Sequence, residues 1–160
     1  MVEIAVGRGV RTHQGYAEAL PFPDRSLDGA LLALALCFVA DAEQALRECF
    51  RVLRPDGGLL LGIIPAESPW GKAYRKRAAE GHPVYAHARF RTVSETVAVA
   101  ESTGFKLRDA ASTLFWPPGA HPETNPRVQT GVVAEAGFVA LSFTKPGRQS
   151  ARERGSGWDQ

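Results

Sequence analysis

Residues 27–64 have the sequence LDGALLALALCFVADAEQALRECFRVLRPDGGLLLGII, and the elements predicted from this stretch decide the fold. Residues 27–38 are apolar apart from one aspartate, which is typical of a strand covered on both faces in the middle of a parallel sheet. A helix is predicted next, and residues 59–64 form a second buried strand. Strand, helix and strand make a βαβ unit with a right-handed crossover, so we predict an α/β fold with a mostly parallel sheet.

The helix between these two strands has its own start and stop signals. Asp41 is a good N-cap residue, and Gln44 stands three residues later as its capping-box partner. Pro55, Gly57 and Gly58 stop the helix. Its apolar residues recur at helical spacing and form one stripe, made of Ala42, Ala45, Leu46, Cys49, Phe50 and Leu53. The stripe predicts that this helix packs one face against the sheet.

Further helices are predicted on both sides of this unit. Residues 1–5 are weakly helical, and residues 68–80 form a longer helix that ends at a glycine. Thr92 and Glu95 make a second capping box, which begins a helix that closes at Gly104.

The remaining segments are predicted as strands and loops. Residues 10–14 are predicted as a strand. Residues 17–24 are predicted as a loop, because prolines at positions 21 and 23 disrupt both a helix and the hydrogen bonds of a β-sheet. Residues 106–116 and 137–145 are β-rich and are expected to pair as a hairpin across a long, proline-rich connection. Residues 146–160 are rich in glycine, arginine and serine, and we expect a disordered tail there.

Composition narrows the class of protein. The chain has 160 residues with 44% hydrophobic and 22% charged residues, which suits one soluble domain, expected over residues 1–145. The net charge of +2 and the absence of a basic run argue against nucleic acid. We see no signal peptide and no apolar run long enough to span a bilayer. Cys37 and Cys49 lie in apolar runs outside any C-x-x-C pair, so reduced, buried thiols in the cytoplasm are expected.

Three linked motifs resemble class I S-adenosylmethionine-dependent methyltransferases of the type that acts mostly on small molecules (methyltransferase domain 11-like). They are GYAEALPFPD at 15–24, SLD at 26–28 and ALRECFRVLRPDGG at 45–58. Further segments are similar to a subgroup of small prokaryotic methyltransferases, namely CFVAD at 37–41, SPWG at 68–71, AHARF at 86–90 and AASTLF at 110–115. The resemblance spans about residues 1–145.

The resemblance implies a Rossmann-like fold with seven strands in the order 3-2-1-4-5-7-6, the last one antiparallel. Strands one and two have no counterpart in this chain, so we expect an N-terminally truncated domain that lacks the family's glycine-rich turn and ribose-binding acid. Gly7-Arg8-Gly9 is best interpreted as the turn that follows the first helix. The third strand would then be an unpaired edge and one side of the fourth strand would be uncovered, and the chain could form a homodimer through this edge.

The resemblance also assigns residues to the binding site of S-adenosyl-L-methionine. Tyr16, Ala17 and Glu18 match the loop that meets the adenine, although Tyr16 replaces an aspartate found in many members. Glu18 could equally be a solvated loop carboxylate. Ala33 and Leu34 match positions that line the methionine end of the cofactor, and they are also expected in the sheet core.

A cluster of aromatic and basic residues follows the second predicted strand, where the family tends to contact substrate. His87 would serve as a general base and Arg89 as an anion clamp. Trp70 is expected to pack, and His82 to cap a helix end. We predict no metal site, because His82 and His87 have no suitably spaced third ligand.

Three hypotheses about function remain open. The first is a methyltransferase of a small molecule, inactive or impaired as this chain alone. The second is a non-catalytic methyltransferase-like module that pairs with itself or with another subunit. The third is another nucleotide-binding α/β protein, such as a short dehydrogenase, against which the loop at residues 17–22 argues.

Overall fold

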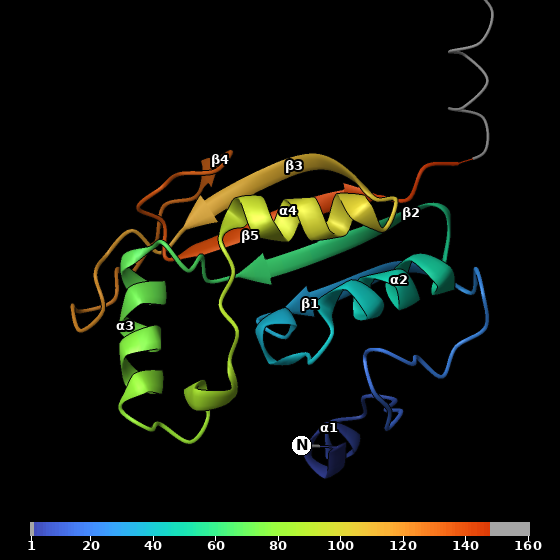
Figure 1. Cartoon of the computed structure of the whole chain (residues 1–160), viewed down its shortest axis with the longest axis horizontal. Helices are drawn as coiled ribbons and strands as arrows, with labels where there is room; N and C mark the ends of the chain where they lie inside the picture. Colours follow the sequence, from blue (N-terminus) through green and yellow to red (C-terminus); the bar gives the residue numbers. More distant parts are fainter. Residues whose placement is uncertain (1, 148–160) are drawn as a thin grey trace, which may run out of the picture.

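The computed structural model describes residues 2–147, which are built around a five-stranded sheet (Figure 1). In the order β1-β2-β5-β3-β4, the strands are β1 (Leu27–Ala33), β2 (Leu53–Ile63), β5 (Phe138–Thr144), β3 (Lys106–Thr113) and β4 (Gln129–Thr130). β1 is parallel to β2, and β5 is antiparallel to both β2 and β3. β1, β2 and β3 therefore share one direction and β5 opposes them. This confirms the predicted methyltransferase fold and the order of its last four strands.

The helices lie in two places relative to the sheet. α2 (Ala42–Val52) and α4 (Val93–Ser102) cover one face, whereas α3 (Pro69–Ala79) and the 3₁₀ turn η2 (Tyr85–His87) stand beyond the carboxyl ends of β1 and β2 (Figure 1). α1 (Val2–Gly7) lies away from the sheet. No helix within residues 2–147 is long and apolar enough to cross a membrane.

The predicted N-caps at Asp41 and Thr92 are confirmed. The Asp41 carboxylate accepts a hydrogen bond of 2.9 Å from the backbone N–H of Gln44 at the start of α2. Thr92 and Glu95 form both bonds of the capping box of α4. These bonds join residues three positions apart, which is why the sequence pattern alone could locate them.

The core lies between the sheet and the helices α2 and α4. It is made of Leu36, Ala42, Leu46, Cys49, Leu53, Leu59, Leu61, Ala100, Phe105, Ala136, Val139, Leu141 and Phe143. The predicted apolar stripe supplies Ala42, Leu46 and Cys49 from α2, and its last residue, Leu53, begins β2. The far end of α2 is closed by Lys145, whose Nζ donates to the carbonyls of Phe50 (2.6 Å) and Leu53 (2.7 Å). Burial of this ammonium lowers the pKa of Lys145.

The prediction of one central strand over residues 27–38 is wrong. β1 ends at Ala33, the chain turns at Leu34, and a 3₁₀ turn, η1 (Leu36–Phe38), follows. β1 is also the edge of the sheet. Its Leu31 pairs with Leu60 of β2, and these two side chains are 64% and 41% exposed. Residues 2–147 therefore bury only the other face of the sheet, although both strands are apolar enough for burial on two faces.

The prediction of a strand over residues 10–14 is wrong as well. These residues have no ladder, and the only bridge nearby is the short pairing of Tyr16 with Ala19. A strand needs a hydrogen-bonded neighbour, and no described segment stands beside this one. Residues 148–160 of the predicted tail lie outside the described residues.

Candidate functional site

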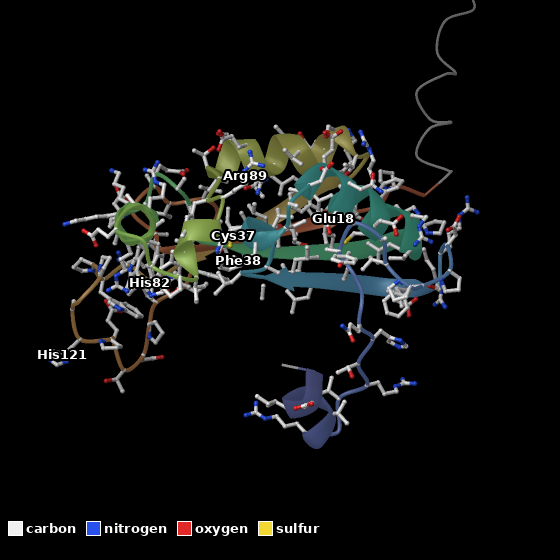
Figure 2. The ribbon with its side chains drawn as sticks, turned by 60° about the horizontal axis from the view of Figure 1, so that its bottom comes forward. Glu18, Cys37, Phe38, His82, Arg89 and His121 are labelled. Carbon is white, nitrogen blue, oxygen red and sulfur yellow. The ribbon has the colours of Figure 1, made fainter. Side chains whose placement is uncertain are left out.

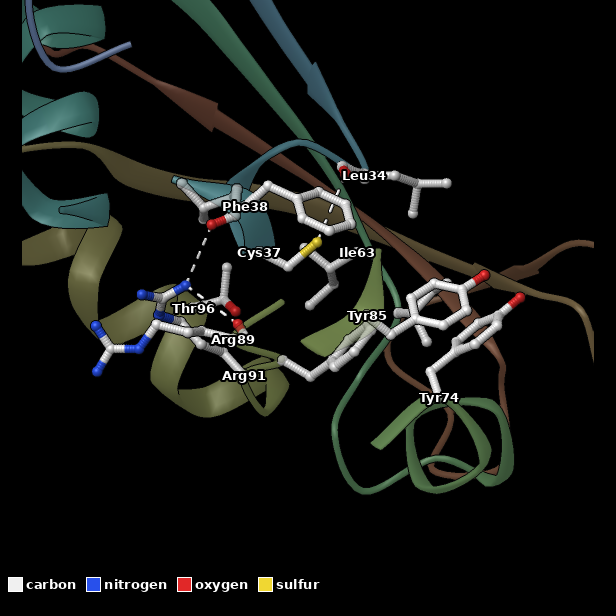
Figure 3. A pocket seen from close by; sticks show the side chains of 13 residues that line it. Leu34, Cys37, Phe38, Ile63, Tyr74, Tyr85, Arg89, Arg91 and Thr96 are labelled. Atoms are coloured by element: carbon white, nitrogen blue, oxygen red, sulfur yellow. Dashed lines mark hydrogen bonds between the residues drawn. The ribbon is translucent and has the colours of Figure 1, made fainter. Parts of the chain in front are cut away.

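A cavity of about 140 Å³ opens at the carboxyl ends of β1 and β2 (Figure 3). Ligands of α/β proteins bind at this end of the strands, where the connections diverge. The cavity is lined by Leu34, Leu36, Cys37, Phe38, Gly62, Ile63, Ile64, Tyr74, Tyr85, Arg89, Phe90, Arg91 and Thr96. The lining is mainly aliphatic and aromatic, and its only charged side chains are arginines.

Leu34 forms the turn between β1 and η1 at the edge of this cavity. Its φ of +54° lies in the left-handed region, which is unusual for a residue other than glycine. The turn is held by the N–H of Leu34, which donates to the carbonyl of Gly62 over 2.8 Å. Cys37 lies three residues later, in η1, and burial raises the pKa of its thiol. A neutral thiol is a weak nucleophile, so Cys37 acts here as part of an apolar wall.

The opposite wall comes from the segment that follows α3. The backbone N–H of Arg89 donates to the carbonyl of Cys37 over 2.7 Å, which ties this segment to η1. The rings of Tyr74 and Tyr85 lie 4.5 Å apart, and Tyr74 lies 6.0 Å from Phe90. Burial is the main cause that raises the pKa of Tyr74. Four elements that are distant in sequence, the end of β2, η1, α3 and η2, thus close one apolar site.

Glu18, assigned by resemblance to the cofactor, binds backbone in this structure. Its Oε1 accepts from the N–H groups of Ala40 (3.1 Å) and Asp41 (3.2 Å), just before α2. The Gln44 side chain donates to the carbonyl of Glu18 over 3.3 Å. Gln44 therefore serves the loop rather than completing a capping box. Figure 2 shows Glu18 beside α2, apart from Cys37, Phe38 and Arg89.

The loop around Glu18 is anchored by an ion-pair network on α2. The N–H of Leu20 donates to Glu48 over 2.8 Å, and Arg51 donates to Glu48, to Asp24 and to the carbonyls of Leu20 and Phe22. The Arg51 hydrogen bond, ahead of the bond from Leu20, lowers the pKa of Glu48. The loop predicted from its two prolines is thereby held against α2 by charge-assisted hydrogen bonds. These bonds join residues that lie about 30 positions apart in the sequence.

Tyr16 and Ala17 line a second cavity of about 200 Å³, together with Arg11, His13, Gly15, Leu20, Pro21 and Phe22. Tyr16 is 80% exposed. Of the other residues assigned to the cofactor, Leu34 lines only the first cavity, and Ala33 and Glu18 line neither of the two. Sites for ligands of this size usually enclose about 300–1,000 Å³. Within residues 2–147 the predicted residues therefore do not fit the whole cofactor.

Of the two residues predicted to contact substrate, only one lines a cavity. Arg89 lines the first cavity, whereas His87 is exposed on η2 and is not part of its lining. The Trp70 indole donates to the carbonyl of Trp116 over 2.7 Å, in agreement with a packing role. His82 Nδ1 accepts from the N–H groups of Val84 (3.3 Å) and Tyr85 (3.5 Å), whereas the residue that caps the end of α3 is Glu80.

Phe38, Ile63 and Phe90 were missed by the sequence reasoning as site residues. The sequence offered a sign of this site, because the segments CFVAD and AHARF are both similar to the same subgroup of methyltransferases. In the structure, the N–H of Arg89 donates to the carbonyl of Cys37 and so joins the two segments at the cavity. No group of three or more metal-binding side chains occurs in the described part of the chain.

Comparisons with known proteins agree with this fold. The sequence model of a methyltransferase domain family matches residues 1–61. An uncharacterized protein of Mycobacterium tuberculosis is 39% identical over 135 residues, which cover 84% of this chain and 47% of that protein. The chain thus spans about half the length of this relative. A ubiquinone/menaquinone biosynthesis C-methyltransferase of Hahella chejuensis is 48% identical over 61 residues, 38% of this chain and 24% of that protein.

A solved structure from Thermotoga maritima is similar over most of the chain. That protein is described as a SAM-dependent methyltransferase and possible histamine N-methyltransferase. It superposes with a TM-score of 0.84 at 38% identity, covering 91% of this chain and 69% of the other. The chain therefore belongs to the family of class I S-adenosylmethionine-dependent methyltransferases.

Proposed function

We propose that this chain carries the substrate side of a small-molecule methyltransferase site, and that it binds S-adenosylmethionine only weakly on its own. The observation that carries this proposal is the apolar cavity at the carboxyl ends of β1 and β2. Methyl transfer depends on positioning and on exclusion of water more than on acid–base groups. An apolar cavity without a catalytic dyad suits that chemistry.

Weak cofactor binding follows from the separation of the two cavities. Ala17 would meet the adenine end, and Ala33 and Leu34 the methionine end, but Ala17 lines the second cavity, Leu34 the first and Ala33 neither. Glu18 is already engaged with the backbone before α2. The binding energy of the two ends is therefore not combined in one preorganised site.

A titration with S-adenosylhomocysteine, followed by ¹⁵N NMR of the backbone amides, tests this proposal. We expect the signals of Ala17 and Leu34 to shift with one common dependence on ligand, in the millimolar range. Adenosine alone should shift only Ala17, and methionine only Leu34. No shift at any of these amides up to millimolar ligand would refute cofactor binding, and micromolar affinity would refute the expected impairment.

A non-catalytic module is a second candidate, favoured by the edge position of β1. The outer edge of β1 has no partner among the described residues, and the exposed Leu31 and Leu60 stand side by side on the uncovered face. Such an edge can pair with a second copy or with another subunit. Sedimentation velocity checks this candidate, since a monomer at all concentrations would exclude a homodimer.

A further inference from the structure

The first cavity has a size that points to one kind of occupant. Its volume of about 140 Å³ is close to the roughly 150 Å³ of an apolar protein cavity that holds benzene. It thus has room for one six-membered ring.

The walls favour a flat ring. Figure 3 shows Phe38, Cys37 and Ile63 grouped on one side of the cavity and the rings of Tyr85 and Tyr74 on the other. Aromatic side chains bind a further ring by stacked or edge-on contacts, which add to the gain from burial alone. The Cys37 thiol stays protonated because of its burial and adds no charge to this wall.

The charges at the cavity favour an anion. Arg89 and Arg91 are its only charged lining residues, and no carboxylate lines it. The guanidinium of Arg91 donates to the carbonyls of Leu36 (3.3 Å) and Arg89 (3.5 Å). Within residues 2–147 the guanidinium of Arg89 makes no hydrogen bond and no ion pair, and in Figure 3 it points away from Phe38 and Tyr85, so this exposed side chain would rotate toward the cavity to meet a ligand there.

We propose that this cavity binds a monocyclic aromatic acid, with the ring between Phe38 and Tyr85 and the carboxylate at Arg89. Its interpretation as the methyl-acceptor site rests on the proposed function above. The substrate class would then be small aromatic acids, and Arg89 would decide between charged and neutral rings.

The test uses 4-fluorobenzoate as the probe and 4-fluorobenzyl alcohol as its uncharged match, both followed by ¹⁹F NMR. Because Arg89 is exposed, we expect the acid to bind about two- to fivefold more tightly than the alcohol. Arg89→Gln should remove this difference. The matched variant Arg75→Gln should keep it, because Arg75 is an exposed arginine of α3 that does not line the cavity.

Alkylation of the two cysteines locates the probe. Cys37 lines the cavity, whereas Cys49 is only 4% exposed and burial raises its pKa to about 11. We expect 4-fluorobenzoate to slow the reaction of Cys37 with iodoacetamide, with Cys49 as the unreactive internal reference. Equal binding of acid and alcohol, or an unchanged rate at Cys37, would overturn the proposal.

The same samples separate this proposal from the proposed function. Protection of Cys37 by 4-fluorobenzoate without any shift by S-adenosylhomocysteine would support the ring site and refute the cofactor site. Shifts induced by S-adenosylhomocysteine without binding of 4-fluorobenzoate would support the cofactor site and refute the ring site. Displacement of 4-fluorobenzoate by adenosine would also overturn the ring site, because the cavity would then bind the adenine of the cofactor, which is expected at Ala17.

Discussion

Gly71→Ala should destabilise the protein, although helix propensity predicts the opposite. Gly71 is buried in the first turn of α3, the helix that presents Tyr74 to the cavity. In an open helix this exchange stabilises by about 1 kcal/mol. Here an added Cβ would overlap the carbonyl oxygen of Pro65 and lie 2.9 Å from Cα and O of Ala66.

The cost can be worked from the contacts that would have to change. To restore a normal separation, the first turn must move by about 1 Å away from residues 65 and 66. That movement strains the cap at Ser68, whose Oγ accepts from the N–H of Gly71 (3.0 Å) and donates to the carbonyl of Pro65 (2.8 Å). A lost cap costs about 1 kcal/mol and overpacking about 1–3 kcal/mol. After the gain in propensity, we expect a net loss of about 1–3 kcal/mol.

Urea unfolding followed by circular dichroism measures this loss as a lower midpoint at an unchanged slope. Gly58→Ala is the matched control, because an added Cβ at Gly58 meets nothing within 4 Å and its φ is not positive. We expect this variant to stay within about 0.5 kcal/mol of the unmodified protein. If Gly71→Ala is as stable as Gly58→Ala, α3 does not pack closely enough against residues 65 and 66 to exclude a Cβ at position 71, and the prediction is refuted.

Three other predictions concern the charged groups that hold α2. Because Arg51 lowers the pKa of Glu48, this carboxylate stabilises the fold above its ordinary pKa of 4.5 and loses that effect as the pH falls further, so Glu48→Gln should flatten acid unfolding in this window. Lys145→Met should lower the free energy of unfolding by about 1–3 kcal/mol, because two carbonyls at the end of α2 lose a charged donor. Glu18→Ala should cost about 1 kcal/mol in urea unfolding, whereas Glu18→Gln keeps an acceptor oxygen and most of the stability.

Each of these has a control in the same chain. Glu43→Gln alters an exposed carboxylate of α2 and should leave acid unfolding unchanged, and a similar effect at both positions would contradict the role of Glu48. Lys106→Met changes an exposed lysine, and an equal loss there would remove the argument for Lys145. If Glu18→Gln keeps its stability but loses the shifts induced by S-adenosylhomocysteine, Glu18 contacts the cofactor as well.

Much of the fold could be predicted because its signals are local. The caps of α2 and α4 depend on side chains that bind backbone three residues away, so Asp41, Thr92 and Glu95 mark helix starts in the sequence itself. The pairing of β3 with β5 followed from two β-rich segments near the end of the chain. Three linked motifs indicated the family, and the order of the last four strands is what that resemblance implies.

The site could be predicted only in part, because its parts are far apart in the chain. Glu18 binds the N–H of Ala40, 22 residues away, and the backbone of Arg89 meets Cys37 across 52 positions. No local preference encodes such contacts. The resemblance assigned Leu34 and Arg89 to one active site, and both line the first cavity, whereas Tyr16 lines the second.

The sequence by itself determined the periodic and capped elements, the α/β class and the family, since these depend on neighbouring residues and on motif spacing. Only the tertiary structure decided where β1 ends, which face of the sheet is covered and which side chains line the cavity. The apolar run at residues 27–38 shows the reason. Hydrophobicity dictates that such a run tends to be buried, but whether Leu31 is covered depends on which other segments pack there, and that is a property of the whole chain.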